Sequence, residues 1–266
     1  MEFRLCAIAS GSSGNCTFIQ AGMRKILVDI GISGKKVTEG LQLIDIDPET
    51  IEGIFITHEH IDHIRGVGIF SRKYDTPIYA TQKTWEKMLN EKMLGAVKEA
   101  NIKILEKETY LQLEEFQIFP YGIYHDAVDP VGYIFEYQGK KITLATDIGV
   151  VDERIKTYLK GSNGILLEFN HDVNMLEAGS YPFYLKKRIL SDVGHLNNEM
   201  AAQTLSEIYH AEMQWVVLGH LSKDNNVPDL AYLTAKQALE ERNIRVGEDI
   251  IVSVAKRDTV SPIYKV

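Results

Sequence analysis

The chain has 266 residues, 45% of them hydrophobic, and a formal net charge of −8, which is typical of a globular protein with a sizeable core. The acidic balance argues against a broad basic surface for gripping duplex nucleic acid, although bound metal ions would add positive charge that composition omits. Its apolar runs fall short of the ~20 residues of a membrane span, and its N-terminus is too polar for a signal peptide. We therefore expect a cytoplasmic protein.

The predicted elements begin as a run of strands and later alternate with helices. Three strands come first, at 3–10, 16–21 and 24–31, and the turn-rich SGSSGN joins the first two. The later strands are 51–57, 77–81, 115–123, a hairpin over 131–147 that turns at Gln138–Gly139, 164–169, 215–220 and 250–255. The helices are 33–44, 62–74, 81–94, 197–211 and 227–243. This order predicts an α/β fold of two sheets layered between helices, and the lack of a linker predicts one domain over 1–266.

Polar residues capable of metal binding or proton transfer follow five separate predicted strands. They are His58, His125, Asp147, Glu168 and His220. A scaffold fixes side chains at strand ends while the adjoining loops stay open to substrate. This distribution predicts a functional site at those ends.

The densest cluster is His58-Glu59-His60-Ile61-Asp62-His63. In an extended turn, residues two apart point the same way, so His58 and His60 can approach one ion. Asp62 and His63 come at the first turn of the next helix and can hold a second ion. A hydrolytic zinc needs about three protein ligands and an open position, so His125, Asp147 and His220 are the expected completions.

These residues predict a centre of two metal ions ~3.5–4 Å apart, with Asp147 as the bridging ligand and a water or hydroxide between the ions. The ligands must be nitrogen and oxygen, because Cys6 and Cys16 are isolated and read as small apolar residues in or beside strands. The residues leave zinc and manganese both open, since imidazole suits zinc and carboxylates accept manganese.

The motif HxHxDH between a strand and a helix resembles the signature of the metallo-β-lactamase superfamily. Further segments are similar to its YycJ/WalJ-type branch; they are ASGSSGN, YHDAVDPVGY, ATDIG, LLEFNHDVNML, GHLNNE and LGHLSKDNN. The resemblance covers nearly the whole chain. It implies an αβ/βα four-layer sandwich of two mixed sheets flanked by helices, and an activity similar to that of 5′-to-3′ DNA exonucleases and, more distantly, tRNA 3′-processing endonucleases.

The same resemblance implies the ligand sets. His58, His60 and His125 would hold one metal, Asp62, His63 and His220 the other, and Asp147 would bridge them. We count Asp62, Glu168 and His195 as catalytic. Glu168 and His195 resemble a carboxylate–histidine pair in which the histidine protonates the leaving oxygen.

Expected substrate contacts come from two segments. Ser12, Ser13 and Asn15 belong to SGSSGN, whose backbone N–H groups could cradle a phosphate, and the resemblance adds Asn225 and Asn226. His171 could bind a ligand or hydrogen-bond one. The basic run Lys186–Arg188 stands just before His195 and could steer a nucleic-acid backbone.

The sequence thus predicts a dinuclear metal-dependent phosphodiesterase, most simply a 5′-to-3′ DNA exonuclease in DNA repair or processing, with a metal-bridging hydroxide as nucleophile. One alternative is a small-molecule hydrolase of the same fold, acting on a cyclic phosphodiester, a thioester or a lactam. The other alternative is a non-catalytic regulatory scaffold. Such a protein is expected to have lost some metal ligands, whereas this chain retains all the expected ones.

Overall fold

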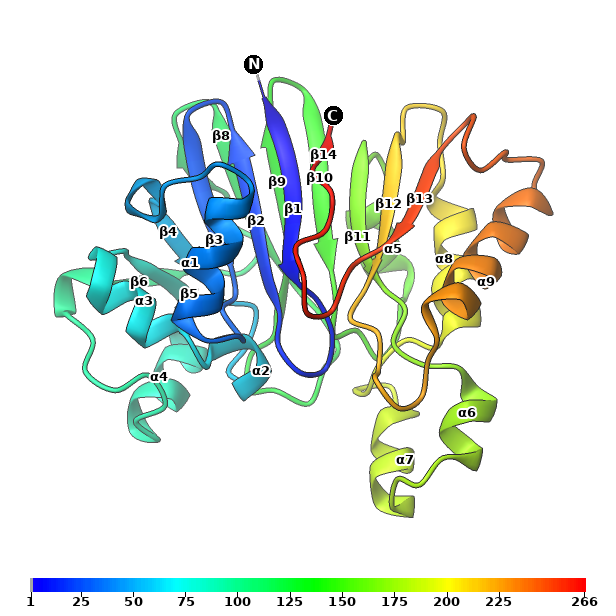
Figure 1. Cartoon of the computed structure of the whole chain (residues 1–266), viewed down its shortest axis with the longest axis horizontal. Coiled ribbons are helices and arrows are strands. Elements are labelled where there is room, and N and C mark those ends of the chain that lie inside the picture. Colours follow the sequence, from blue (N-terminus) through cyan, green and yellow to red (C-terminus); the bar gives the residue numbers. More distant parts are fainter. Residues whose placement is uncertain (1) are drawn as a thin grey trace. The chain divides into compact units, whose positions relative to one another are not determined.

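The fold contains two mixed β-sheets of seven strands each, flanked by helices (Figure 1). This is a computed structural model, and it describes residues 2–266. The strand orders are β14-β1-β2-β3-β4-β5-β6 and β13-β12-β11-β10-β9-β8-β7. The predicted α/β class with two sheets is therefore confirmed. The chain divides into two compact units, and the expected single domain over 1–266 stays a prediction.

Unit 1 comprises the chain up to Gly122, together with Ala127–Gln138 and Lys256–Lys265. Its first sheet consists of β14 (Tyr264–Lys265), β1 (Phe3–Ala9), β2 (Cys16–Ala21), β3 (Arg24–Val28), β4 (Gly53–Phe55), β5 (Ile78–Thr81) and β6 (Ile102–Leu105). Strands β1 to β3 pair antiparallel and β3 to β6 parallel. The unit also holds β7 (Leu111–Leu113), β8 (Phe116–Gly122) and β9 (Val131–Tyr137).

The helices of unit 1 are α1 (Gly34–Leu43), α2 (Ile61–Ile64), α3 (Val67–Tyr74) and α4 (Gln82–Asn90). Buried residues of α1, α3 and α4, such as Leu41, Phe70 and Trp85, join residues of β1 to β5 in one hydrophobic core. Burial of this apolar face fixes the sheet under the segment that carries the HxHxDH motif.

Unit 2 comprises Ile123–Asp126, Gly139–Ala255 and Val266. Its strands are β10 (Lys140–Ala145), β11 (Gly164–Glu168), β12 (Trp215–Gly219) and β13 (Ile251–Val254), all paired in parallel. Its helices are α5 (Glu153–Leu159), α6 (Val173–Ala178), α7 (Phe183–Ile189), α8 (Asn198–Ile208) and α9 (Pro228–Glu240). Helix α9 packs against α8 and β13, and α6 and α7 extend away from the strands of this unit (Figure 1). Parallel strands end at the same edge, which gathers the polar residues that follow them.

The helix predicted over 62–74 is wrong as one element, because the structure breaks it into α2 and α3 at Gly66. Gly66 donates its N–H to Ile30 O at 2.7 Å, and a Cβ at this position would lie 2.2 Å from Ile32 O. The chain therefore passes too close to the loop after β3 for any other residue. The break makes α2 a single turn that presents Asp62 and His63.

The two cysteines lie buried in β1 and β2, as the sequence led us to expect. Burial raises the pKa of the Cys6 thiol to about 12 and that of Cys16 well above its ordinary value. Both thiols are therefore protonated and unreactive at neutral pH. Over residues 2–266, every helix is too short or too polar to cross a lipid bilayer.

Candidate metal centre

In unit 1, the four polar residues of the HxHxDH motif lie together. The ring centroids of His58 and His60 are 4.6 Å apart, and those of His58 and His63 are 4.1 Å apart. Asp62 Oδ2 lies 3.6 Å from His63 Nε2. His58 and His63 are fully buried, whereas the Asp62 side chain is 23% exposed. The two imidazoles are thus enclosed within unit 1, whereas Asp62 reaches the surface.

Asp29, at the end of β3, fixes the orientation of His63. The Nδ1 atom of His63 lies 2.8 Å from Asp29 Oδ2, and Thr57 donates its N–H and its hydroxyl to the same carboxylate at 2.9 and 2.8 Å. The Thr57 hydroxyl oxygen in turn lies 3.0 Å from His58 Nδ1. An Nδ1–H that donates to oxygen turns Nε2 toward a metal, which is the usual arrangement around ligand histidines. Burial raises the pKa of Asp29, against the opposing charge of His63.

Glu59, between the two histidines, has a different task. It is buried, and its Oε1 accepts a hydrogen bond from Val128 N at 2.9 Å. The side chain thereby anchors the loop before β9 to the motif, within unit 1. Because alternate residues of an extended segment point in opposite directions, this contact leaves His58 and His60 on the other side.

In unit 2, Asp147 and His220 follow β10 and β12, and both adopt left-handed backbone conformations, with φ of 59° and 55°. Such values are uncommon outside glycine, and they cluster at functional sites where the surrounding structure enforces them. Asp147 Oδ1 lies 3.2 Å from His220 Nδ1. The parallel pairing of β10 to β12 thus brings two predicted ligands together.

Glu168, the last residue of β11, is fully buried and accepts hydrogen bonds from four protein donors. His195 Nδ1 and His220 Nδ1 reach Oε1 at 2.8 and 2.9 Å, and the N–H groups of Ile148 and Leu196 reach Oε2 at 2.8 and 3.3 Å. Burial alone would raise the pKa of this carboxyl. The charge of His195 and the hydrogen bonds from both histidines outweigh it, so the Glu168 pKa lies well below its usual range.

Two further histidines of unit 2 are buried beside this cluster. His125 Nδ1 lies 3.1 Å from Gly194 O, and His171 Nδ1 lies 3.3 Å from Asn170 Oδ1. Burial lowers the pKa of each to about 4. Both rings are therefore neutral at physiological pH, the state in which an imidazole nitrogen can bind a metal.

The donor set fits divalent metal ions. In four of the predicted ligand histidines, Nδ1 lies within hydrogen-bond distance of a protein oxygen, which leaves Nε2 as the nitrogen for a metal. They are His58, His63, His125 and His220. Asp147, Glu168, His195 and His220 also offer ligand atoms within 4.8 Å of one another. However, an ionised carboxylate has about four acceptor sites, and protein donors occupy those of Glu168. With these contacts in place, Glu168 has no acceptor site left for a metal ion.

The predicted substrate contacts differ in accessibility. Ser12 and Ser13 are exposed. Asn15 is buried: its N–H donates to Asp62 O at 2.8 Å, and its Nδ2 lies 3.1 Å from His63 Nε2. Asn225 and Asn226 are also buried, and the Asn226 amide donates to Phe169 O at 2.9 Å. Contact of these three residues with substrate stays a prediction.

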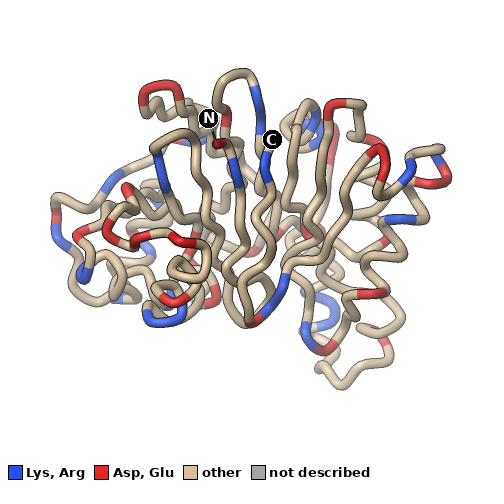
Figure 2. Tube along the Cα trace, turned by 45° about the horizontal axis from the view of Figure 1, so that its top comes forward, with Lys and Arg blue, Asp and Glu red and all other residues tan. Residues whose placement is uncertain are grey.

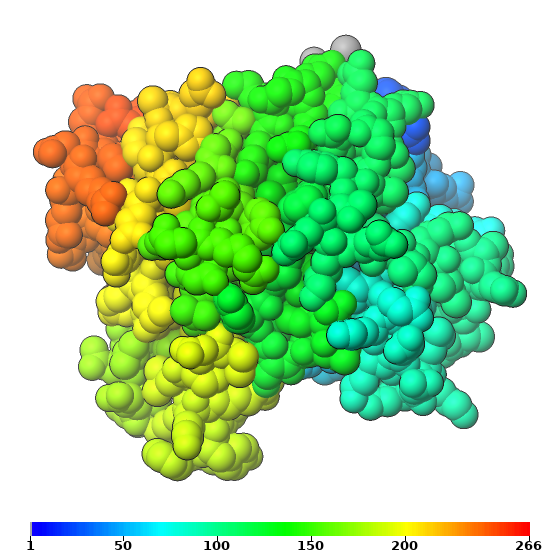
Figure 3. Space-filling view, turned by 180° about the vertical axis from the view of Figure 1, so that it is seen from behind, coloured from blue at the N-terminus to red at the C-terminus, as the bar shows by residue number. Residues whose placement is uncertain are grey.

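The basic run before His195 lies on α7, in the part of unit 2 that projects outward (Figures 1 and 3). Lys186 Nζ donates to Glu177 O and Gly179 O at 2.7 and 2.6 Å, and Arg188 is paired with Asp126. Lys187 is exposed, with no hydrogen bond or ion pair from its side chain within residues 2–266. Acidic and basic residues are scattered along the rest of the described chain (Figure 2). Two of the three cations are thus paired with groups of unit 2.

The fold and these strand-end residues define a protein of the metallo-β-lactamase class, and the family model "Metallo-beta-lactamase superfamily" matches residues 9–192. The chain belongs to this superfamily. It is 41% identical over 264 residues to exodeoxyribonuclease WalJ of Streptococcus pneumoniae, covering 99% of this chain and 98% of the relative. It is 40% identical over 248 residues to exodeoxyribonuclease YycJ of Bacillus anthracis, covering 93% of each.

Solved structures share the fold at low sequence identity. The metallo-β-lactamase fold protein YhfI from Bacillus subtilis matches all of both chains with a TM-score of 0.74 and 15% identity. The short form of human tRNase Z matches 97% of this chain and 98% of its own with a TM-score of 0.63 and 16% identity. At these identities the likeness supports the fold alone.

Sequence reasoning missed Asp29, Thr57 and Glu59. Asp29 stands 34 positions before His63, and only its place at the end of a buried strand marked it. Thr57 and Glu59 lie inside the motif, but a threonine or a glutamate between histidines has no spacing that distinguishes a supporting role from an exposed one. Their roles depend on contacts that only the folded chain makes.

Proposed function

We propose that this chain is a metal-dependent exonuclease that degrades DNA from the 5′ end. The full-length similarity to two exodeoxyribonucleases supports the substrate class. The observation that carries the chemistry is Glu168, which binds both His195, the proposed acid, and His220, a proposed ligand. We further propose that the enzyme acts in the cytoplasm, in DNA repair or processing.

Seven residues would hold two divalent ions in this proposal. His58, His60 and His125 would bind one, Asp62, His63 and His220 the other, and Asp147 both. When bound, such ions lower the pKa of water and neutralise charge on phosphate oxygens. Zinc and manganese both suit this set of imidazoles and carboxylates.

His195 would protonate the oxygen that leaves the phosphorus. Its Nδ1 is held by Glu168, so the Nε2 atom carries the proton that can be transferred. The Glu168 carboxylate thereby holds the His195 ring in one orientation. A general acid of this kind is needed because the leaving 3′-oxygen of a nucleotide is a poor leaving group without a proton.

The test is the digestion of end-labelled nucleic acid by protein stripped of metal and reloaded with zinc or manganese separately. A 5′ label on linear DNA should appear at once in mononucleotides, while a 3′ label should pass through a ladder of shortened strands. Internal cuts, release from the 3′ end, or digestion of RNA alone would each contradict the proposal. The His195→Ala variant, loaded in the same way, serves as the inactive control.

A further inference from the structure

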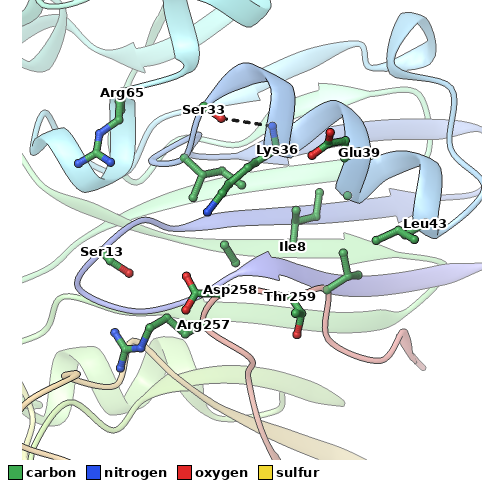
Figure 4. Close-up of a pocket in the computed structure, with 14 residues that line it drawn as sticks. Ile8, Ser13, Ser33, Lys36, Glu39, Leu43, Arg65, Arg257, Asp258 and Thr259 are labelled. Atoms are coloured by element: carbon green, nitrogen blue, oxygen red, sulfur yellow. Dashed lines mark hydrogen bonds between the residues drawn. The ribbon is translucent and has the colours of Figure 1, made fainter.

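Unit 1 contains a cavity of about 470 Å³ that the proposed chemistry does not use. It lies between α1, the SGSSGN loop, the end of α2 and the segment after Ala255 (Figure 4). Its volume is in the range of small-molecule sites, which starts near ~300 Å³. Residues from four separate segments line it, so the folded unit forms this cavity.

Three cations from different segments line the cavity. Lys36 comes from α1, Arg65 from the C-terminal end of α2, and Arg257 from the segment near the C-terminus. Within residues 2–266, the side chains of Lys36 and Arg65 form no hydrogen bond or ion pair. Figure 4 shows the Lys36 side chain extending from α1 toward the loop that carries the Ser13 hydroxyl. Two cations without a hydrogen-bonded or ion-paired partner, together with a hydroxyl at the same cavity, favour an anionic group that accepts several hydrogen bonds, such as a phosphate.

The rest of the lining selects against a bare phosphate ion. Glu39 and Asp258 also line the cavity and would repel a small anion, while Ile8 and Leu43 offer apolar contacts that it could not use. A nucleotide satisfies both sets of groups. Its phosphate would meet the cations, its base would cover the apolar side chains, and its amino or hydroxyl groups would donate to the carboxylates.

The cavity adjoins the proposed ligands of unit 1. Asn15, two residues after Ser13, donates its N–H to Asp62 O at 2.8 Å. Arg65 follows Asp62 by three positions, about one helical turn, or ~5 Å along the axis. A strand whose terminal nucleotide fills the cavity could therefore extend directly past Asp62.

We infer that this cavity binds a nucleoside 5′-monophosphate unit, with the phosphate on Lys36, Arg65 and Ser13. Such a unit is either the 5′ end of a DNA strand or a free mononucleotide. The first case rests on the proposed exonuclease function and makes the cavity the site that recognises the strand end. The second case is independent of that function.

The strand-end case is tested with metal-loaded protein and DNA that carries either a 5′-phosphate or a 5′-hydroxyl. Wild-type protein should have a KM about tenfold or more lower for the phosphorylated strand, since one charge-assisted hydrogen bond contributes roughly that factor. The variant with both Lys36→Gln and Arg65→Gln should lose this preference. Lys83→Gln is the control, because Lys83 is exposed on α4 and does not line the cavity.

Hydrolysis of bis(4-nitrophenyl) phosphate separates the two proposals, because this small diester has no 5′ end. The double variant should hydrolyse it as wild type does, which also shows that the variant is folded. Equal KM values for both strands in wild type, or a preference retained in the double variant, would overturn the strand-end case. Absence of DNA digestion by wild type would overturn the proposed function instead.

The free-nucleotide case is tested by calorimetry with deoxyadenosine monophosphate and with deoxyadenosine. Binding of the monophosphate that weakens about tenfold or more in the double variant, and not in Lys83→Gln, supports the site whatever the DNA assay gives. If wild-type protein prefers phosphorylated strands but does not bind free deoxyadenosine monophosphate, the cavity is a site for strand ends alone. Failure of both measurements rejects the nucleotide site.

Discussion

The Nδ1 atom of His195 lies 2.8 Å from Oε1 of Glu168, a carboxylate that is fully buried. The same oxygen receives His220 Nδ1 at 2.9 Å, so one carboxylate orients a proposed acid and a proposed ligand together. His195 would need Glu168 for proton transfer, whereas His220 would need it for metal binding. Experiments that vary the leaving group test the first role, and measurements of metal content test the second.

Replacing His195 should impair proton transfer without removing metal. His195→Ala is expected to slow DNA hydrolysis ~10²–10⁴-fold, because the leaving oxygen would depart unprotonated. For a nitrophenyl diester the loss should be much smaller, since nitrophenolate leaves without a proton. His210→Ala is the matched control, because His210 lies elsewhere in unit 2, with Nε2 3.1 Å from Ser162 O. An equal loss on both substrates, or loss of metal, would exclude His195 as the acid.

Replacing Asp147 should remove metal. In the proposed centre this carboxylate is the ligand shared by both ions, and its left-handed backbone at φ 59° fixes it after β10. Asp147→Ala should therefore reduce bound metal well below two ions per chain and abolish hydrolysis. Metal content is measured by elemental analysis after dialysis. Full occupancy together with activity would show that Asp147 is not a ligand.

Asp29 provides a test of a residue that orients a ligand without binding the metal itself. Asp29→Asn keeps the size of the side chain but weakens the acceptor of His63 Nδ1–H, so metal affinity should fall ~10–100-fold. Competition with a chromogenic chelator measures this change. Asp45→Asn is the control, because Asp45 is exposed and its left-handed φ of 58° matches the φ of 57° at Asp29. Unchanged affinity in Asp29→Asn would confine Asp29 to a role in folding.

The helices and strands that the sequence predicted were those with a strong apolar periodicity. Strand β7 was missed because its three residues, Leu111–Leu113, are only partly buried or exposed. Helices α6 and α7 were missed because each is short, and Gly179 and Pro182 separate them. Such elements form because the surrounding chain holds them in place, and their own sequences carry a weak signal.

The candidate ligands could be predicted because chemistry restricts them to few residue types and because four of them lie close together in the sequence, in the HxHxDH motif. The residues around the ligands could not be predicted in this way. Asp29 contacts His63 across 34 positions, and Lys36, Arg65 and Arg257 meet at one cavity only through the fold of unit 1. Contacts of this kind depend on three-dimensional packing, which no local spacing encodes.

Metal-free protein should lose stability in acid partly through His171. Burial lowers its pKa from 6.5 to about 4, so between these values the unfolded chain binds a proton that the folded chain does not. The contribution of His171 to the free energy of unfolding is thus fully present above pH 6.5. It falls as the pH drops toward 4, by at most about 1.4 kcal/mol per pH unit. Urea unfolding at pH 7, 5.5 and 4.5 with chelator present should show a shallower decline for His171→Gln. The same slope in both proteins would contradict the assignment.

Two neighbouring lysines of α7 should differ in their roles: Lys186 in the stability of the fold, and Lys187 in electrostatic attraction of DNA. Lys186 caps α6 by donating to Glu177 O and Gly179 O, so Lys186→Gln should lower the melting temperature. Lys187 is exposed, and its side chain is unpaired within residues 2–266, so Lys187→Gln should leave the melting temperature unchanged. If Lys187 contacts a DNA phosphate, its removal should reduce the slope of log affinity against log salt by about one. Fluorescence anisotropy over a salt series measures that slope, and an unchanged slope in Lys187→Gln would show that α7 does not contact the DNA backbone through this residue.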